Sequence, residues 1–258
     1  MIGPHGLGGS TLLTIAGIAA LAAAGSQVEG RGKARPEATE QAVCRRATKP
    51  PTLDGKLNDP CWAEADVIDK FPAFWAGTPS GSGTRARLAW DDDNLYFSAA
   101  MTDREMRAFG TKRNDHLWNG DVFELFFKPS PDSPAYYEFQ VNPKSVIFEI
   151  AIPHRGFPLD KLVAAPPMGT TAVAVVDGTL DTPGDVDRGW TVEGKIPWTT
   201  FAPSGGRPTT GDVWRFALCR YDYGPDGTRP VLMSSAPLGQ PSFHRHEDYG
   251  RLIFAAAK

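Results

Sequence analysis

Cysteine is scarce in this chain of 258 residues, which limits the cross-links and metal sites that it can form. The three cysteines Cys44, Cys61 and Cys219 allow at most one intrachain disulfide, and one thiol is then left over. Cys44 with Cys61 closes the shorter loop and is the preferred pair, while three buried, unbridged thiols are the alternative. No C-x-x-C-H motif occurs, which argues against a covalently attached c-type haem.

A large excess of charge of either sign is also lacking. The 27 Lys and Arg residues nearly balance the 30 Asp and Glu residues, and the formal net charge is -3. The sequence contains no dense run of Lys and Arg that could neutralise a row of phosphates. Nucleic acid is therefore a poor candidate partner.

No long segment shows the 3.6-residue period of an amphipathic helix, whereas 27 Gly and 23 Pro punctuate the chain as they do between short strands. The hydrophobic share of 41% is ample for a buried core. We predict an all-β fold, an antiparallel two-sheet β-sandwich of the jelly-roll kind with short helical turns, in one domain over residues 42–258. The predicted strands cover residues 84–90, 95–101, 122–128, 135–142, 146–152, 172–176, 190–196, 213–223 and 252–254.

The first 41 residues are expected to lie outside this domain. No residue from Gly6 to Val28 is charged, and the apolar stretch ends in the small residues 22–25, as at a signal cleavage site, although a basic n-region is missing. We predict a signal peptide over residues 1–24 and a solvated linker over residues 25–41, with an uncleaved anchor as the alternative. The mature protein would be secreted, periplasmic or at the cell surface, without a membrane span.

A hairpin around residues 129–134 is the most informative part of the sequence. If it closes symmetrically about Asp132, Phe123 faces Val141, Leu125 faces Phe139 and Phe127 faces Tyr137, so this face is apolar. The other face then carries amide and carboxyl groups, with Glu124 opposite Gln140, Val122 opposite Asn142 and Glu138 beside Phe126. Such a face suits a polyhydroxylated ligand, and an ordinary solvated sheet face is the alternative.

Six ordered segments resemble the family 9 carbohydrate-binding modules. They are residues 53–62, 89–97, 115–124, 137–142, 196–198 and 242–252, and together they span nearly all of the predicted domain. The resemblance implies a β-sandwich that binds a polysaccharide or oligosaccharide without cleaving it, in association with polysaccharide breakdown or uptake. Calcium is the one cofactor that it suggests.

The resemblance also implies the site residues. Trp118 occupies the position of one ring that stacks on the sugar, and Phe243 occupies the position of the other, where well-known sugar binders have Trp. The polar contacts map onto Glu124, Gln140 and Asn142, although sugar-binding members have Arg at the Gln140 position. These two departures concern the identity of the sugar rather than the fold.

Two other functions compete for the same residues. A glycoside hydrolase could use Glu124 with Glu138, whereas Asp121 and Glu124 have an odd spacing that puts them on opposite faces of a strand. No G-x-S-x-G nucleophile motif is present. A haem-binding redox domain of the DOMON kind could use His244, His116 or Met101 as axial ligands.

Two clusters could hold a metal ion. Asp181, Asp185 and Asp187, with Asp177 before them, lie in one loop that contains Gly and Pro, and their oxygens suit calcium. The alternative is that these acids only form turns. His244 and His246 would share one face of a strand and could ligate zinc, but no third ligand is fixed by the spacing.

Overall fold

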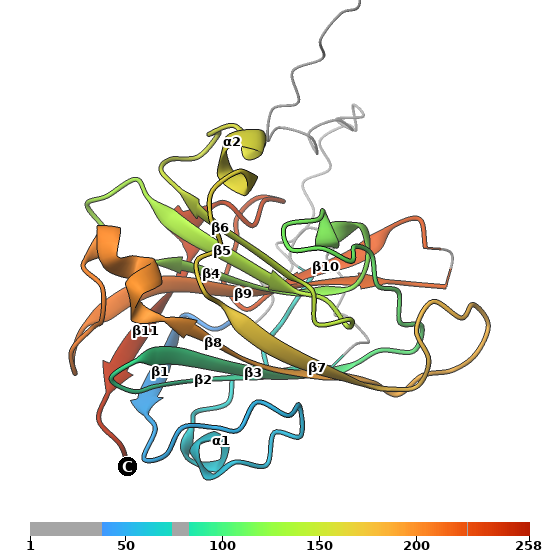
Figure 1. Cartoon of the computed structure of the whole chain (residues 1–258), viewed down its shortest axis with the longest axis horizontal. Coiled ribbons are helices and arrows are strands. Elements are labelled where there is room, and N and C mark those ends of the chain that lie inside the picture. The colour runs from blue at the N-terminus through green and yellow to red at the C-terminus, as the bar shows by residue number, and fades with distance from the viewer. Residues whose placement is uncertain (1–37, 74–82, 226) are drawn as a thin grey trace, which may run out of the picture.

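The protein is described by a computed structural model over residues 38–73, 83–225 and 227–258, and the predicted signal peptide lies outside these residues. Eleven strands in the described part join in one sheet, with two short helices at its periphery (Figure 1). No helix in these residues is long and apolar enough to cross a membrane. The elements are β1 (Gln41–Arg46), α1 (Pro60–Glu64), β2 (Thr84–Trp90), β3 (Asn94–Thr102), η1 (Leu117–Asn119), β4 (Val122–Lys128), β5 (Tyr136–Val141), β6 (Ile147–Ile152), α2 (Leu159–Val163), β7 (Thr171–Asp177), β8 (Gly189–Pro197), η2 (Trp198–Ser204), β9 (Val213–Tyr223), β10 (Pro230–Ser234), η3 (His246–Asp248) and β11 (Gly250–Ala255).

The prediction of an all-β fold is confirmed, and so are all nine predicted strands, three of them (β2, β4 and β9) with the predicted bounds. Two strands were missed. β1 begins at Gln41, inside the predicted linker, and Thr39 already donates its backbone N–H to the carbonyl of Ser235 at 2.7 Å. The linker boundary is therefore too late by a few residues. β10 is short and starts at a proline, which hides it from a search for alternation.

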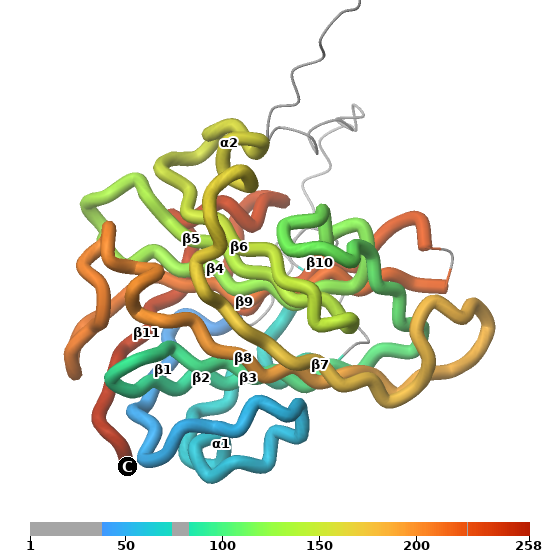
Figure 2. The backbone as a smooth tube through the Cα atoms, viewed as in Figure 1, coloured from blue at the N-terminus to red at the C-terminus, as the bar shows by residue number. Residues whose placement is uncertain are grey.

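The sheet is mixed, which corrects the prediction of two antiparallel sheets. β1 runs parallel to both β11 and β2, whereas the other paired strands of the described chain are antiparallel. β1 thereby joins the series β6-β5-β4-β9-β11 to the series β2-β3-β8-β7 in one continuous sheet. Figure 2 shows how β1 and β11, from opposite ends of the described chain, lie side by side. The sequence pattern of a strand does not reveal which edge it will join.

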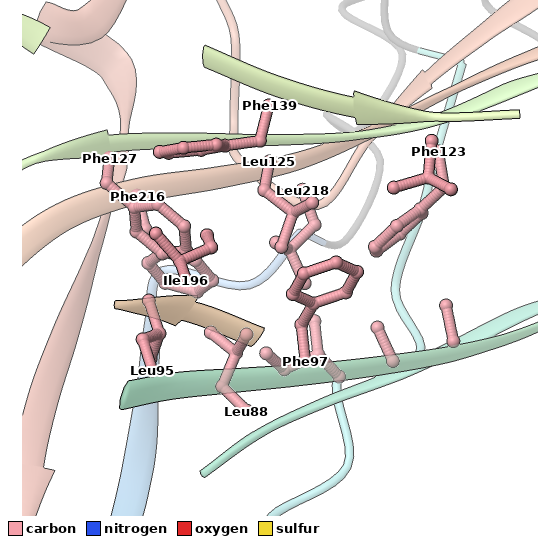
Figure 3. Packing of buried hydrophobic residues seen from close by; sticks show 14 of the residues in the cluster. Leu88, Leu95, Phe97, Phe123, Leu125, Phe127, Phe139, Ile196, Phe216 and Leu218 are labelled. Carbon is pink, nitrogen blue, oxygen red and sulfur yellow. The ribbon is translucent and has the colours of Figure 1, made fainter. Parts of the chain in front are cut away.

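The two series face each other across the main hydrophobic core, here called the inner core. Figure 3 shows side chains of β4 and β5, such as Leu125 and Phe139, pointing toward those of β2 and β3, such as Leu88 and Phe97. All four side chains are at most 1% exposed. The predicted hairpin register is confirmed, since Leu125 pairs with Phe139 and the neighbouring apolar pairs follow.

The opposite face of β4, β5, β6 and β9 is buried as well, which corrects the expectation of an open outer face. Helix α2, the segment after β10 and the chain before β11 cover it with a second cluster, here called the outer core. Phe126, Phe148 and Tyr249 are among its buried members. Alternation indicates which side chains share a face, but it does not indicate what covers that face.

The cysteines are unbridged, so the preferred Cys44–Cys61 disulfide is wrong and the alternative is confirmed. Each thiol is buried, in a different cluster. Cys44 belongs to the inner core and Cys219 to the outer core, while Cys61 and Trp62 of α1 pack in a third, smaller cluster. Burial raises the pKa of Cys61 to about 12.

The loop that precedes α1 is held by one buried carboxylate. Glu193 of β8 accepts the backbone N–H groups of Asp54 and Gly55 at 3.1 and 2.7 Å. The same carboxylate accepts the indole N–H of Trp62 at 2.7 Å. This contact explains why the turn at residues 53–55 and Trp62, seven residues later, fold as one unit, because both need the same acceptor.

The inner core can be tested with a charge. We expect Leu125→Asp to lose more than about 4 kcal/mol of the free energy of unfolding, because it buries an unpaired carboxylate. Glu124→Gln, on the adjacent residue of the other face, should keep the melting temperature within about 4 °C. Thermal melting that leaves both variants at the wild-type temperature would show that the assigned core face is incorrect.

The Glu193 contact gives a second prediction. Glu193→Ala leaves three donors without their acceptor and should cost about 3 kcal/mol in urea unfolding. Lys195→Ala, two residues along the same strand, is the matched control and should change stability by less than about 0.5 kcal/mol. Equal effects of the two variants would contradict the assignment.

Candidate functional site

A polar pair, Glu124 and Gln140, lies in the middle of the outer face of the sheet. Gln140 pairs with Glu124 of β4 on one side and with Phe148 of β6 on the other, so the three side chains form a row across the strands. The predicted pairing of Glu124 with Gln140 is confirmed. The row is buried, with Glu124 at 2% and Gln140 at 1% exposure.

Gln140 has one satisfied and one unsatisfied end. Its Nε2 donates to Oε1 of Glu138 at 2.6 Å, two residues back on the same strand. Its Oε1 is buried and accepts no hydrogen bond from any residue that the structure describes. A buried acceptor without a donor is costly, so this oxygen is a place where a ligand hydroxyl would gain a strong partner.

The two carboxyl groups beside Gln140 are driven toward their neutral forms. Burial, and then the charge of Glu138, raises the pKa of Glu124 well above its usual range. Burial raises the pKa of Glu138 to about 7, although its hydrogen bond from Gln140 opposes the shift. A neutral carboxyl can both donate and accept, which suits contacts with sugar hydroxyls.

Asn142, the third predicted polar contact, is engaged inside the protein. Its Oδ1 accepts the backbone N–H groups of Lys144 and Val146 at 3.0 and 2.9 Å. Its Nδ2 donates to the carbonyl of Phe109 at 2.8 Å. Asn142 therefore fixes the β5–β6 turn and links it to the loop before Gly110.

Trp118 is half-buried at the edge of the outer core, in η1. Its ring meets Phe148 edge-on at 5.4 Å between centroids, and the imidazole of His116 stacks on it at 4.6 Å with an interplanar angle of 18°. The carbonyl of Trp118 accepts the hydroxyl of Tyr223 at 2.8 Å. Phe148 is the cross-strand neighbour of Gln140, so the ring of Phe148 lies between Gln140 and the ring of Trp118.

Phe243 lies on the other side of the row but is buried. It packs against Phe126 and Tyr221 with centroid distances of 6.3 and 5.5 Å, and 6% of it is exposed. Tyr221 pairs with Val122 and Phe126 is two residues beyond Glu124, so Phe243 spans Glu124. In this arrangement Phe243 has no open face for a sugar, and the sequence could not show this because the cover of the outer face is long-range.

The acids predicted to bind calcium hold a loop instead. Asp187 accepts the backbone N–H of Met106 at 3.0 Å and that of Thr179 at 2.7 Å, while Asp181 accepts the N–H of Ala108 at 2.9 Å. Asp185 binds the hydroxyl of Thr179. Their oxygens do not converge into a group of three, so the residues do not fit the predicted calcium site.

One other group of acids does converge, at Asp103, Asp121 and Asp222, within the described part of the chain. The guanidinium of Arg220 donates to Asp103 at 3.1 Å and to Asp222 at 2.8 Å, so the cluster already contains its own cation. Burial raises the pKa of Asp103 to about 6 and that of Asp121 to about 8. These acids form a structural network with Arg220.

The remaining predicted ligands are engaged in separate places. Met101 is in the inner core, His116 stacks on Trp118, and Nδ1 of His244 lies 3.0 Å from the hydroxyl of Tyr136. The described residues contain no group of three ligating atoms that includes His244 or His246, so the zinc hypothesis has no support in the geometry. Glu124 and Glu138, the carboxyl pair considered for hydrolysis, are both under the outer core.

The loop over residues 105–109 is a part of this region that the sequence did not predict. Asp121 accepts the backbone N–H of Arg107 at 2.5 Å and that of Tyr223 at 2.6 Å. Alternation along β4 could not indicate this contact, because the N–H group that Asp121 accepts lies 14 residues earlier in a loop without a regular pattern.

Comparisons with known proteins agree with the fold. Residues 53–256 match the family described as carbohydrate family 9 binding domain-like. The chain is 31% identical over 88 residues to Exoglucanase XynX of Acetivibrio thermocellus and 26% identical over 156 residues to Endo-1,4-beta-xylanase A of Thermoanaerobacterium saccharolyticum. These matches cover 34% and 60% of this chain, but 8% and 12% of the two relatives.

A solved structure has a similar fold. A carbohydrate binding module of family 9 from Caldicellulosiruptor kristjanssonii in complex with cellotriose superposes with a TM-score of 0.58 at 14% identity. The superposition covers 84% of this chain and 95% of that chain. At this identity the similarity is one of fold.

The carboxyl at Glu138 predicts how stability depends on pH. Its folded pKa of about 7 exceeds the ordinary value of 4.5, so the folded state binds the extra proton. Its contribution is complete below pH 4.5 and is lost as the pH rises toward 7. The free energy of unfolding in urea should therefore fall less steeply with pH for Glu138→Gln than for the wild type. The difference in slope should correspond to about one bound proton.

Glu40→Gln, at an exposed glutamate, is the control and should follow the wild-type curve. His244 acts with the opposite sign, because burial lowers its pKa to about 4 and its contribution is lost as the pH falls. Parallel curves for Glu138→Gln and the wild type between pH 4.5 and 7.5 would contradict the raised pKa.

Proposed function

The chain belongs to the carbohydrate family 9 binding domain-like family, and we propose that it binds carbohydrate without cleaving it. The observation that carries the proposal is the unpaired Oε1 of Gln140, whose cross-strand neighbours are Glu124 on one side and Phe148, the residue on which Trp118 packs, on the other. A sugar ring offers what this place needs, since its C–H face can stack on an indole and its hydroxyls can donate to a buried oxygen.

Trp118 is the primary contact in this proposal. It is half-buried, so its ring is held by Phe148 while part of it stays accessible. Glu124 and Gln140 supply hydrogen bonds beneath, and their contact with the sugar depends on a shift of the groups that now cover them. Phe243 closes the far side as an apolar wall, and Asn142 positions the turn rather than the sugar.

The same comparisons support a proposal for the biological setting. Two relatives are an exoglucanase and an endo-xylanase, and the chain corresponds to about a tenth of the length of each. We propose that the protein acts outside the cytoplasm, after removal of residues 1–24, in the breakdown or uptake of a polysaccharide. A β-1,4-linked glucan is the first probe to try, because the similar module binds cellotriose.

Trp118 gives the decisive test. Trp118→Ala should weaken cellotriose binding about thirtyfold in calorimetric titration, equivalent to about 2 kcal/mol, because it removes the stacking surface. Phe157→Ala is the matched control, since Phe157 is another partly buried aromatic packed on the outer core. Phe157→Ala should lose about as much stability as Trp118→Ala but keep the wild-type affinity for cellotriose.

The opposite pattern would overturn the assignment. A Trp118→Ala variant that binds as tightly as the wild type, or one that loses about 3 to 5 kcal/mol of stability as a core residue does, would place Trp118 in the core alone. Thermal melting of the same samples separates the two results.

A further inference from the structure

A hollow of about 190 Å³ lies beside the proposed site, between the loop over residues 105–109 and the turn after β9. Phe109, Asn119 and Tyr223 line it, together with Arg107 and Asp181. Asn119 follows Trp118 directly, and Tyr223 donates its hydroxyl to the carbonyl of Trp118, so the hollow adjoins the backbone of the residue that carries the proposed stacking ring.

Phe109 is unusually open for an aromatic side chain. It is 49% exposed, and the other large hydrophobic side chains that are exposed in the described residues are all valines. Exposure of an aromatic ring to water is unfavourable compared with its burial, so an exposed aromatic beside a hollow marks a contact surface.

The backbone that carries Phe109 is fixed by three acids. The N–H groups of residues 106, 107 and 108 are accepted in turn by Asp187, Asp121 and Asp181, at 3.0, 2.5 and 2.9 Å. Three successive N–H groups bound to three carboxylates leave this loop little freedom, which is rare for a surface segment.

The carbonyls of the same loop are fixed as well. Those of Ala108 and Phe109 accept the Nζ of Lys144 and the Nδ2 of Asn142, at 2.9 and 2.8 Å. Gly120 packs so closely that a Cβ there would lie 2.6 Å from the backbone nitrogen of Phe109. The backbone that carries the open ring is thus held in place, which lowers the backbone entropy lost on binding.

The polar groups of the hollow suit a neutral polyol. Nε of Arg107 is buried and has no hydrogen-bond partner in the described residues, while Nη2 donates to the carbonyl of Pro225 at 2.6 Å. Asp181 bonds Lys144 and Arg107 lies 3.6 Å from Glu105, so both charged groups of the hollow have an opposite charge beside them and the hollow favours hydroxyls over an ion.

We propose that this hollow is a second sugar subsite, in which Phe109 stacks on a pyranose next to the one that Trp118 holds. The inference rests on the proposed function, and it extends the site from one sugar ring to a longer oligosaccharide. Its ligand is a neutral β-linked glycan long enough to reach both rings.

Chain length separates the two subsites. Glucose, cellotriose and cellohexaose are titrated calorimetrically into the wild type, Phe109→Ala, Phe109→Tyr and Trp118→Ala. Phe109→Ala should weaken the binding of cellohexaose about five- to tenfold and leave the binding of glucose unchanged. Phe109→Tyr should bind both as the wild type does, because it keeps the aromatic ring. Val67→Ala, at another exposed apolar residue, is the control and should bind all probes as the wild type does.

The other outcomes of these titrations distinguish the two proposals. If Phe109→Ala binds cellohexaose as the wild type does while Trp118→Ala loses glucose, the second subsite is wrong and the proposed function stands. If Phe109→Ala weakens glucose and cellohexaose equally, Phe109 supports the Trp118 site and the subsite is also wrong. A wild-type chain that binds none of the probes overturns both proposals.

Discussion

Carboxylates that accept backbone N–H groups, most of them buried, are the constraint on which the loops of this protein depend. Glu193 holds the turn at Gly55, and Asp187, Asp121 and Asp181 hold successive residues of the loop before Phe109. Each of these acids satisfies donors that no strand can satisfy, because the loops run beyond the end of the sheet. The strands form the scaffold, and the acids fix the backbone of the loops that carry the surface side chains.

This constraint also explains why acidic residues mislead a prediction made from sequence. A loop rich in Asp suggests calcium because the same oxygens that bind cations also bind N–H groups. Asp181 and Asp187 use them for the backbone, and Asp103 shares a guanidinium from Arg220. Whether such an acid binds a cation or a backbone N–H group depends on where donors distant in sequence lie. The composition of the loop does not give that position.

Much of the fold could be predicted because alternation is local. The pairing of Leu125 with Phe139, and of Glu124 with Gln140, follows from the period of two and from one hairpin turn. The parallel strand β1 could not be predicted, since its partners β11 and β2 are brought together only by the continuous sheet. The cover over the outer face was missed for the same reason.

The candidate site combines both kinds of information. Gln140 and Glu124 belong to the predictable hairpin, whereas the cover over them comes from Phe243, more than a hundred residues later. An unpaired oxygen at Gln140 persists because the covering segment brings rings and no donor to it. The fold thus leaves the Oε1 of Gln140 unpaired under an apolar cover, and half-buried Trp118, on the far side of Phe148, is the proposed contact for a sugar.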